Sequence, residues 1–395
     1  MNSAGLYVHI PFCTKKCAYC DFFSIPKTSA VEDRYVECLL NEASFYAQRL
    51  GIESWKTIYI GGGTPSLLSA RQISCLLKGL LSSCVKTGAQ PEEVTMEMNP
   101  ESVTAEKLFS AQDGGVTRLS LGIQSLNDAP LREAGRNCSA RQAEEALELV
   151  REAWSGQLSL DAIAGLPGQS GSEFRRSLEK MLSFAPDHFS LYTLTVEEGT
   201  PLSRSIRSGT VSFSGDEADS QWLLGRNILS ENGFFQYEVS NFCRNGKKSI
   251  HNSRYWSQKD YVGIGSGATG TVYGRKSLRW TNCADICAYE QFWSGKKGGA
   301  GVLEAEIPRE TEEIGLADRE FEFLMTGLRT AEGVSAGEYQ ELFCDVAPWH
   351  GNLGLRLSGA GMEHFAVSGS GNSARFALTQ DSILFLNRIL LSLLT

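Results

Sequence analysis

Hydrophobic and polar positions follow two alternating patterns from residue 6 to about residue 235. Six short apolar runs have the length of buried strands, and longer segments with the periodicity of amphipathic helices lie between them. The strands are expected at 6–12, 57–60, 94–98, 118–123, 158–163 and 188–194. The helices are expected near 33–50, 70–83, 104–112, 140–153, 172–183 and 216–232. This repeat predicts an α/β fold in which six parallel strands and their helices form a partial (β/α)6 barrel.

Beyond about residue 235 this repeat ends. A loop-rich stretch punctuated by glycine follows, and the last part of the chain has the patterns of an amphipathic helix, a small hairpin and an apolar helix. We therefore divide the chain into three parts: a (β/α)6 core at 1–235, a loop-rich extension at 236–309 and a small, mainly helical C-terminal domain at 310–395. The C-terminal domain is expected to cover the mouth of the barrel as a lid.

The composition is that of a globular protein. Of the 395 residues, 42% are apolar, which is enough for a substantial core. There are 37 Lys and Arg residues against 46 Asp and Glu residues, and the resulting charge of −9 argues against a nucleic-acid partner. The first residues lack the pattern of a signal peptide, and the apolar run near the end is too short to cross a membrane. Together with eleven cysteines, these features predict a cytoplasmic protein without stable membrane insertion.

Residues with distinctive chemistry follow the predicted strands where the loops begin. The glycines at 61–63 would let a ligand approach the backbone closely, because no Cβ intervenes. Glu97 and Asp161 are acids on strands that are otherwise apolar, so each is expected to meet a hydroxyl, a cation or a network of donors. A capping role, or a salt bridge with Arg118 or Arg136, is the alternative. Because the loops after parallel strands share one face, a site is predicted there.

Three cysteines lie within eight residues directly after the first predicted strand. Cys13, Cys17 and Cys20 offer soft thiolates, which favour iron–sulfur clusters or zinc over hard ions. Three ligands leave one iron of a [4Fe–4S] cube open, and S-adenosylmethionine can chelate that iron through its amino and carboxylate groups. A structural zinc site with His9 as fourth ligand is the alternative. We interpret six other cysteines as packing residues: Cys38, Cys75, Cys84, Cys283, Cys287 and Cys344.

Short motifs of a recognisable kind are spread over nearly the whole chain. They lie at 7–13, 60–66, 120–125, 161–169, 190–201, 279–282, 327–329 and 378–379. Together they resemble the radical S-adenosylmethionine superfamily, and within it the oxygen-independent coproporphyrinogen III oxidase-like group. The resemblance implies a radical-SAM barrel with a [4Fe–4S] cluster on the three cysteines. It also implies contacts to S-adenosylmethionine from Tyr7, Tyr19, Gly62, Gly63, Thr64, Glu97, Gln124, Arg136 and Asp161.

Two branches of this group differ in what they do with a porphyrin. One is a dehydrogenase that decarboxylates two propionates of coproporphyrinogen III, and the other is a heme chaperone that hands heme to respiratory enzymes. Phe22 stands where the dehydrogenase pattern has a further cysteine, and only twelve residues precede Cys13. Residues 251–256 also match the His-Asn-x-x-Tyr-Trp motif of the chaperone branch. The resemblance therefore favours the chaperone.

His251 is the residue of this motif that we expect to contact heme. Imidazole is a usual axial ligand of heme iron, and the Tyr and Trp of the motif can stack on a porphyrin face. From the residues alone, the alternative is a histidine that caps a turn beside two core aromatics. Two histidines of the family pattern are replaced by Cys138 and Thr269, and a residue commonly basic or Cys is Ile250. These changes weaken the case for a site built from several histidines.

Three functions remain as hypotheses. The favoured one is a carrier that binds heme or another porphyrin, with heme-accepting respiratory proteins as partners and a homodimer as its assembly. The second is a radical enzyme, most simply the coproporphyrinogen III dehydrogenase, in which the cluster cleaves S-adenosylmethionine. The third is a zinc-stabilised barrel that only binds. No residue is assigned a catalytic role, and whether the chain is an enzyme stays open.

Overall fold

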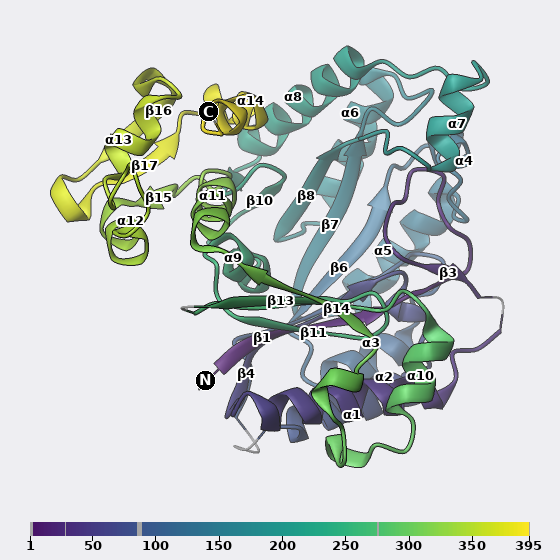
Figure 1. The fold of residues 1–395 in the computed structure, drawn as a ribbon. Helices are drawn as coiled ribbons and strands as arrows, with labels where there is room; N and C mark the ends of the chain where they lie inside the picture. Colours follow the sequence, from purple (N-terminus) through teal and green to yellow (C-terminus); the bar gives the residue numbers. More distant parts are fainter. Residues whose placement is uncertain (1–2, 28, 85–88, 275, 395) are drawn as a thin grey trace.

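Six parallel strands form the centre of the structure, a computed structural model that describes residues 3–27, 29–84, 89–274 and 276–394 (Figure 1). They are β1 (Ser3–Ile10), β4 (Ser54–Gly62), β5 (Glu93–Met98), β6 (Arg118–Gln124), β7 (Gln157–Ala164) and β8 (His188–Thr193). These strands pair in sequence order, each parallel to the next. The predicted (β/α)6 arrangement is therefore confirmed.

Helices connect these strands and cover the outside of the sheet. They are α1 (Asp33–Arg49), α2 (Ala70–Ser82), α3 (Ala105–Asp113), α5 (Ala140–Ala153), α6 (Gly171–Ser183) and α8 (Gly215–Glu231). A short helix, α4 (Asp128–Glu133), precedes α5, and α7 (Pro201–Arg207) precedes α8. Three of the helices, α2, α5 and α6, are capped by Ser69, Ser139 and Ser170. Each serine hydroxyl accepts a hydrogen bond from the backbone amide three residues later, and the Gln or Glu side chain at that later position accepts one from the serine amide. This reciprocal cap satisfies amide groups that would otherwise lack partners at a helix start.

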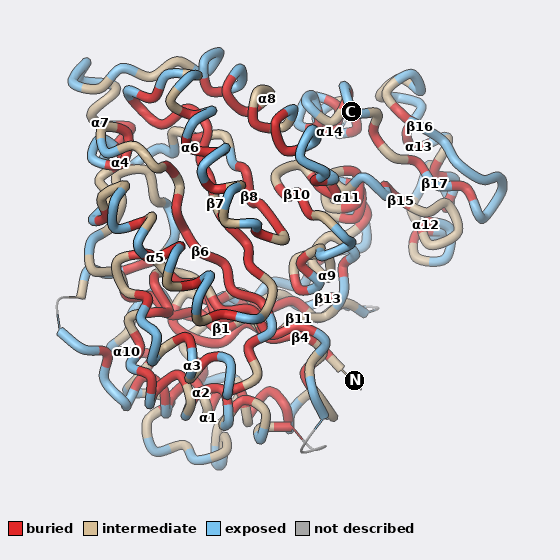
Figure 2. Tube along the Cα trace, turned by 180° about the vertical axis from the view of Figure 1, so that it is seen from behind, coloured by how far each residue is buried: buried red, intermediate tan, exposed pale blue. Residues whose placement is uncertain are grey.

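The parallel strands alternate between an apolar outer face and a polar inner face. On β1, Leu6, Val8 and Ile10 pack into the core, whereas Tyr7 and His9 face the inside of the barrel. Figure 2 shows β6, β7 and β8 buried along most of their length. The inner positions of the other strands carry Tyr59, Thr95, Glu97, Arg118, Ser120, Ser159, Asp161, His188 and Ser190. The interior of this barrel is thus polar enough to hold a charged ligand.

Residues 236–309, expected to be loop-rich, contain more regular structure than the sequence suggested. Six short strands between residues 235 and 314 extend the sheet to twelve, so this sheet runs past the expected boundary at 310: β9 (Phe235–Gln236), β10 (Asn241–Cys243), β11 (Tyr261–Ile264), β12 (Thr269–Val272), β13 (Ser277–Asn282) and β14 (Arg309–Ile314). The strand order is β14-β13-β12-β11-β1-β4-β5-β6-β7-β8-β10-β9. β11 lies parallel to β1, so the central sheet continues into this region. These strands have two to six residues and two of them, β11 and β12, contain glycine, which leaves little periodicity to detect.

Two helices complete this region, and a small strand pair lies in the core near the N-terminus. α9 (Ile250–Trp256) carries the His-Asn-x-x-Tyr-Trp motif, and α10 (Ile286–Trp293) packs on α1. β2 (Phe12–Cys13) and β3 (Ile25–Pro26) form a separate two-stranded pair on either side of the cysteine loop.

The C-terminal domain has a hydrophobic core of its own. Its helices are α11 (Leu316–Gly327), α12 (Ala336–Phe343), α13 (Leu353–Ser358) and α14 (Leu386–Ser392), and its sheet has the order β15 (Val334–Ser335), β17 (Arg375–Leu378), β16 (Phe365–Ser368). Phe323, Tyr339 and Phe343 pack together at the centre of this core. The last two strands are the predicted hairpin, with its turn at 369–374.

The C-terminal domain does not cover the mouth of the barrel, so the lid expectation is wrong. It docks on α9 and on the segment after β9, where Glu238 and Thr330 form a β-bridge. In Figure 1 this domain lies at the opposite side of the molecule from β3 and the cysteine loop. Arg329 fixes the contact, because its guanidinium bonds Glu238 at 3.0 and 3.1 Å and stacks 4.1 Å from the ring centroid of Trp256. Among the described residues, no helix is both long and apolar enough to span a membrane.

Candidate functional site

The cysteine loop lies where the first parallel strand ends. Cys13 is the last residue of β2, and Cys17 and Cys20 follow in the loop that leads to β3. The loop is tied to the barrel rim by a hydrogen bond of 2.9 Å from the Ala18 amide to the Ala134 carbonyl. It is closed on itself by a bond of 3.2 Å from the Cys20 amide to the Cys17 carbonyl. The three thiols therefore share one short, anchored loop.

Polar groups from other loops reach two of these thiols. The Thr64 hydroxyl donates to Cys13 Sγ at 3.6 Å, and Arg136 Nη1 donates to Cys17 Sγ at 3.8 Å. Burial raises the pKa of Cys13 and of Cys20, and a metal ion would oppose that by favouring the thiolate. Within the described part of the chain, no three His, Cys, Asp or Glu side chains form a ready-made metal site. A soft thiolate set beside a cation nevertheless has the donor chemistry that an iron–sulfur cluster requires.

The other cysteines only partly fit the packing interpretation. Cys38 and Cys84 are buried, as expected for small apolar side chains. Cys75, Cys287 and Cys344 are exposed, so for these three the interpretation is wrong. The helical spacing that suggested packing does not by itself indicate which face of a helix points inward.

Glycine is required where the second loop meets the cysteine loop. Gly62 has φ +110°, and a Cβ there would lie 2.5 Å from the His9 ring. At Gly63 a Cβ would lie 2.7 Å from the Phe12 carbonyl oxygen. The Gly63 amide donates to the Ile10 carbonyl at 2.9 Å, which holds the glycine loop against the strand before Cys13. Backbone groups of this loop thus face the cysteine loop without side chains between them.

Two carboxyl groups lie inside the barrel, as the sequence indicated. Glu97 accepts from the Tyr59 hydroxyl at 2.6 Å and from the Gly62 amide at 3.2 Å, and burial raises its pKa to about 7. Burial also raises the pKa of Asp161, which accepts from the Ser120 hydroxyl at 3.3 Å. Both groups are bonded to neighbours, but neither forms the salt bridge that was the alternative.

Other predicted contacts lie around the same rim, and some of their polar atoms lack partners. Gln124 has φ +67° at the end of β6, and its buried Oε1 has no hydrogen-bond partner among the described residues. Arg136 donates to the Gly122 carbonyl at 2.7 Å, while its buried Nε likewise has no partner in the described part of the chain. Strained backbone and unpaired buried polar atoms often mark ligand sites. Tyr19 packs beside this rim, and burial raises its pKa.

A cavity of about 480 Å³ opens inside the barrel, and we name it the barrel cavity. Of the predicted site residues, Tyr7, Gly62 and Glu97 line it. The remaining lining residues are His9, Phe22, Phe23, Tyr59, Asn252, Tyr255, Trp256, Tyr261, Gly267 and Thr269. His9 and Tyr59 could have been found from strand alternation, because they share a strand face with Tyr7 and Gly61. Nothing in the sequence indicated Tyr261.

His251 does not line this cavity and is only 1% exposed. One ring nitrogen, Nδ1, bonds the Thr57 hydroxyl at 2.8 Å, and the other, Nε2, bonds the Tyr255 hydroxyl at 2.6 Å. Burial, with the charges of Arg254 and Arg118, lowers the pKa of His251 to about 3, so the imidazole is neutral. In this conformation both nitrogens are engaged, and neither is free to bind iron.

Known proteins match this chain over most of its length. The Radical SAM superfamily profile matches residues 7–181. A mouse protein named radical S-adenosyl methionine domain-containing protein 1, mitochondrial, is 36% identical over 88% of this chain and 77% of its own. Proteins named heme chaperone HemW are 32% identical in Bacillus subtilis, over 87% of each chain, and 34% identical in Escherichia coli, over 85% of each. The chain belongs to the radical SAM superfamily.

A solved structure shows the same fold. It is coproporphyrinogen III oxidase (HemN) from Escherichia coli, a radical SAM enzyme, which superposes with a TM-score of 0.78 at 21% identity. The match covers 99% of this chain and 90% of that one. The resemblance stated from the motifs is thus confirmed, and membership of the radical SAM superfamily implies a [4Fe–4S] cluster and S-adenosylmethionine. The anchored cysteine loop, and the barrel cavity with its aromatic, hydroxyl and carboxyl groups, fit both groups.

Proposed function

We propose that this chain is a heme chaperone that holds a [4Fe–4S] cluster and S-adenosylmethionine at the barrel mouth. The observation that carries the proposal is the position of α9. Asn252, Tyr255 and Trp256 of its motif line the barrel cavity, opposite Glu97 and Gly62. The motif that resembles the chaperone branch therefore borders the expected cofactor site. Relatives named heme chaperone, at 32% and 34% identity, support the same function.

In this proposal the cofactors are held by residues of the parallel strands and of the loops that follow them. Cys13, Cys17 and Cys20 would bind three irons, and the fourth iron would take S-adenosylmethionine. The cluster supplies an electron when reduced. The groups proposed to bind and orient S-adenosylmethionine are Tyr7, Tyr19, Gly62, Gly63, Thr64, Glu97, Gln124, Arg136 and Asp161. Burial raises the pKa of Glu97 to about 7, and its carboxyl group suits a hydroxyl or an amino group.

Heme contact by His251 requires a rearrangement. Its Nε2 would bind iron only after the Tyr255 hydroxyl, now 2.6 Å away, moves aside. Since the imidazole is already neutral, no proton has to leave first. We further propose a cytoplasmic location, respiratory acceptors of heme and a homodimer.

A coproporphyrinogen III dehydrogenase is the second candidate, because the fold of HemN is shared. Against it, the position of the further cysteine holds Phe22, which is 69% exposed beside the barrel cavity. An anaerobic experiment on the reconstituted protein separates the two. Heme titration and transfer to a heme-free acceptor are measured beside turnover of coproporphyrinogen III with S-adenosylmethionine and a reductant. Heme transfer without decarboxylation, weakened by His251→Ala and not by the exposed control His350→Ala, supports the chaperone. Stoichiometric decarboxylation would make the chain an enzyme.

A further inference from the structure

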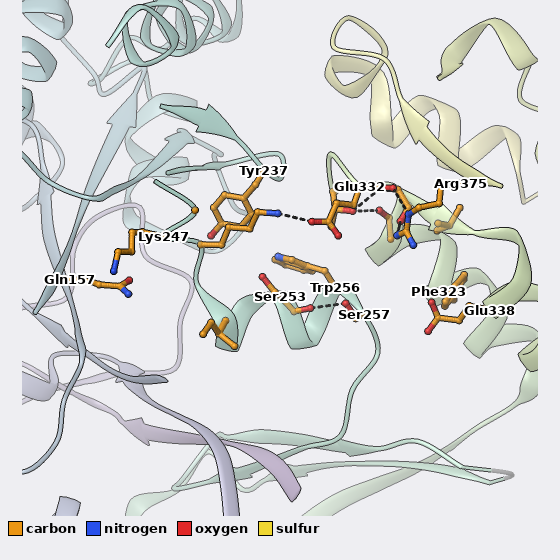
Figure 3. Close-up of a pocket in the computed structure, with 17 residues that line it drawn as sticks. Gln157, Tyr237, Lys247, Ser253, Trp256, Ser257, Phe323, Glu332, Glu338 and Arg375 are labelled. Carbon is orange, nitrogen blue, oxygen red and sulfur yellow. Dashed lines mark hydrogen bonds and ion pairs between the residues drawn. The ribbon is translucent and has the colours of Figure 1, made fainter. Parts of the chain in front are cut away.

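A second cavity, of about 400 Å³, lies between the core and the C-terminal domain, and we name it the interdomain cavity (Figure 3). From the core and the extension at 236–309 it is lined by Gln157, Tyr237, Gly246, Lys247, Lys248, Ile250, Ser253, Trp256 and Ser257. From the C-terminal domain it is lined by Phe323, Gly327, Thr330, Glu332, Gly333, Val334, Glu338 and Arg375. None of the residues proposed to hold the cluster or S-adenosylmethionine is among them, so this cavity is separate from the barrel cavity.

Aromatic rings form one side of the interdomain cavity. Trp256 lines both cavities, and α9 is therefore the wall between them. Its Nε1–H is buried and has no hydrogen-bond partner among the described residues. Tyr237 and Phe323 line the same space from the two domains, as Figure 3 shows. A flat aromatic ligand with an acceptor at its edge would use both the rings and the unpaired donor.

The charges of the interdomain cavity leave an excess of cations. Lys248 pairs with Glu332 at 2.6 Å, so these two largely compensate each other. Glu338 pairs at 3.6 Å with Lys259, which lies outside the cavity lining. Lys247 is exposed, and no ion pair of its side chain is found in the described part of the chain.

Arg375 is the second cation without a bonded carboxylate. Its Nε donates to the Glu332 carbonyl oxygen at 3.1 Å, and its Nη2 donates to the Gly333 carbonyl oxygen at 3.0 Å. These neutral acceptors orient the guanidinium but leave its charge available to an anion, apart from the longer-range effect of the Glu332 carboxylate. The rim therefore carries one such cation from each domain, Lys247 and Arg375.

A buried cation lies behind the inner wall of the same cavity. Arg118 is 2% exposed, and its Nε and Nη1 have no partners among the described residues. Its Nη2 contacts His188 Nδ1 at 3.2 Å, and His188 Nε2 bonds the Tyr237 hydroxyl at 2.9 Å. Gln157, the neighbour of Arg118 across β6 and β7, also lines the cavity. Gln157 thus brings the cavity lining next to a buried cation, which also interacts with the Glu97 and Asp161 carboxyl groups of the barrel interior.

We infer that the interdomain cavity binds a porphyrin through its carboxylates, with the ring against Trp256. The inference rests on the proposed chaperone function and deepens it by naming the site of the cargo. The propionate groups meet Lys247 and Arg375 at the rim. Cofactor and cargo thus lie on opposite sides of α9, and the C-terminal domain supplies one wall of the cargo site.

The test compares a porphyrin diacid with its ester on the full chain. Metal-free protoporphyrin IX and its dimethyl ester are titrated against wild type and the double variant Lys247→Glu/Arg375→Glu. We expect the double variant to bind the diacid about tenfold more weakly and the ester almost unchanged, because only the diacid presents charges to the two positions. Lys78→Glu/Arg151→Glu, on exposed positions of α2 and α5, is the matched control and should bind as wild type. Since the ester reports on the same folded cavity, a misfolded variant is recognised by loss of both ligands.

A third variant decides between the two cavities. Thr269→Trp would fill the barrel cavity and should abolish binding of S-adenosylmethionine while porphyrin binding persists. The inference is overturned if the double variant binds the diacid as tightly as its control does. It is also overturned if Thr269→Trp, and not the double variant, loses porphyrin binding. Either outcome leaves the proposed function intact. A wild-type chain that binds neither heme nor porphyrin overturns the proposed function itself.

Discussion

The barrel cavity and the interdomain cavity share α9 as a wall but are built differently. In the barrel cavity, polar groups such as Tyr59 and Glu97 bond each other from neighbouring parallel strands. In the interdomain cavity, the corresponding contact is the ion pair of Lys248 and Glu332, which joins two domains. The first set of groups is fixed by the alternation of strands, and the second depends on how the domains dock. The barrel cavity should therefore be the more rigid of the two.

The orientation of α9 determines which residue reaches which cavity. The Glu93 carboxylate accepts the Ile250 and His251 amides at 2.9 Å each, which anchors the start of the helix. Tyr255 then faces the barrel cavity, Ser253 faces the interdomain cavity, and Trp256 at the end of the helix lines both. A seven-residue helix is enough to separate two ligands if its start cannot rotate.

Removing the cluster ligands should have the largest effect, and it should change the cluster at the barrel mouth without changing the interdomain cavity. Replacing Cys13, Cys17 and Cys20 together by Ala should lower iron and sulfide from roughly four of each per chain to near zero, because no other set of three thiols lies together among the described residues. Porphyrin binding should persist. Metal and acid-labile sulfide analysis checks the first expectation, with the exposed Cys287→Ala as control. Zinc at one equivalent in the wild type would contradict the cluster, and joint loss of porphyrin would show that the cavities are coupled.

Weakening the contact of the C-terminal domain with the rest of the molecule should affect the interdomain cavity. Arg329→Met removes the cation that pairs with Glu238, a carboxyl group that is fully buried. We expect about 3 kcal/mol of lost stability, as for other buried pairs that lose one member. Urea unfolding measures the loss, and limited proteolysis reports release of the C-terminal domain. Arg151→Met, on an exposed face of α5, should change neither. If porphyrin binding survives undocking, the interdomain cavity is not its site.

The wall of the barrel cavity should respond to pH through a buried acid. Glu42 accepts bonds from the Gly265 amide at 2.8 Å, the Tyr289 hydroxyl at 2.6 Å and the Asn282 amide at 2.7 Å, beside the loop that lines the cavity. Burial raises the pKa of Glu42 to about 7, so the folded protein binds a proton that the unfolded chain has released. The contribution of Glu42 to the free energy of unfolding therefore falls by about 3 kcal/mol as the pH rises from about 4.5 to about 7, and it is constant above that.

The measurement is the free energy of unfolding across that range. Glu97, with a pKa also raised to about 7, lowers the free energy of unfolding over the same pH range. Glu42→Gln should therefore remove roughly half of the slope that these two groups give to the free energy of unfolding against pH. An unchanged slope in the variant would show that Glu42 is ionised in the folded protein throughout.

The strands of the barrel side could be predicted because their signals are local. Alternation on β1 and β4 and the spacing of Cys13, Cys17 and Cys20 depend on residues close together in the chain. The interdomain side could not be predicted, because Lys247 and Arg375 meet only after the domain has docked. The position of His251 was missed for a similar reason. Its partners, Thr57 and Glu93, lie on strands far from it in sequence.

A change in ionic strength should have the smallest effect on ligand binding, but it compares the two cavities most directly. Lys247 and Arg375 are exposed, so salt screens their attraction for carboxylates over distances longer than the Debye length. Raising salt from about 0.05 M to about 0.5 M should weaken binding of the porphyrin diacid roughly threefold, and binding of its ester much less. Binding of S-adenosylmethionine should change by less than about twofold, since the charges of the barrel cavity are buried and bonded. Equal salt dependence of both ligands would mean that both meet exposed charges, and the distinction between a strand-built and a docking-built cavity would then be lost.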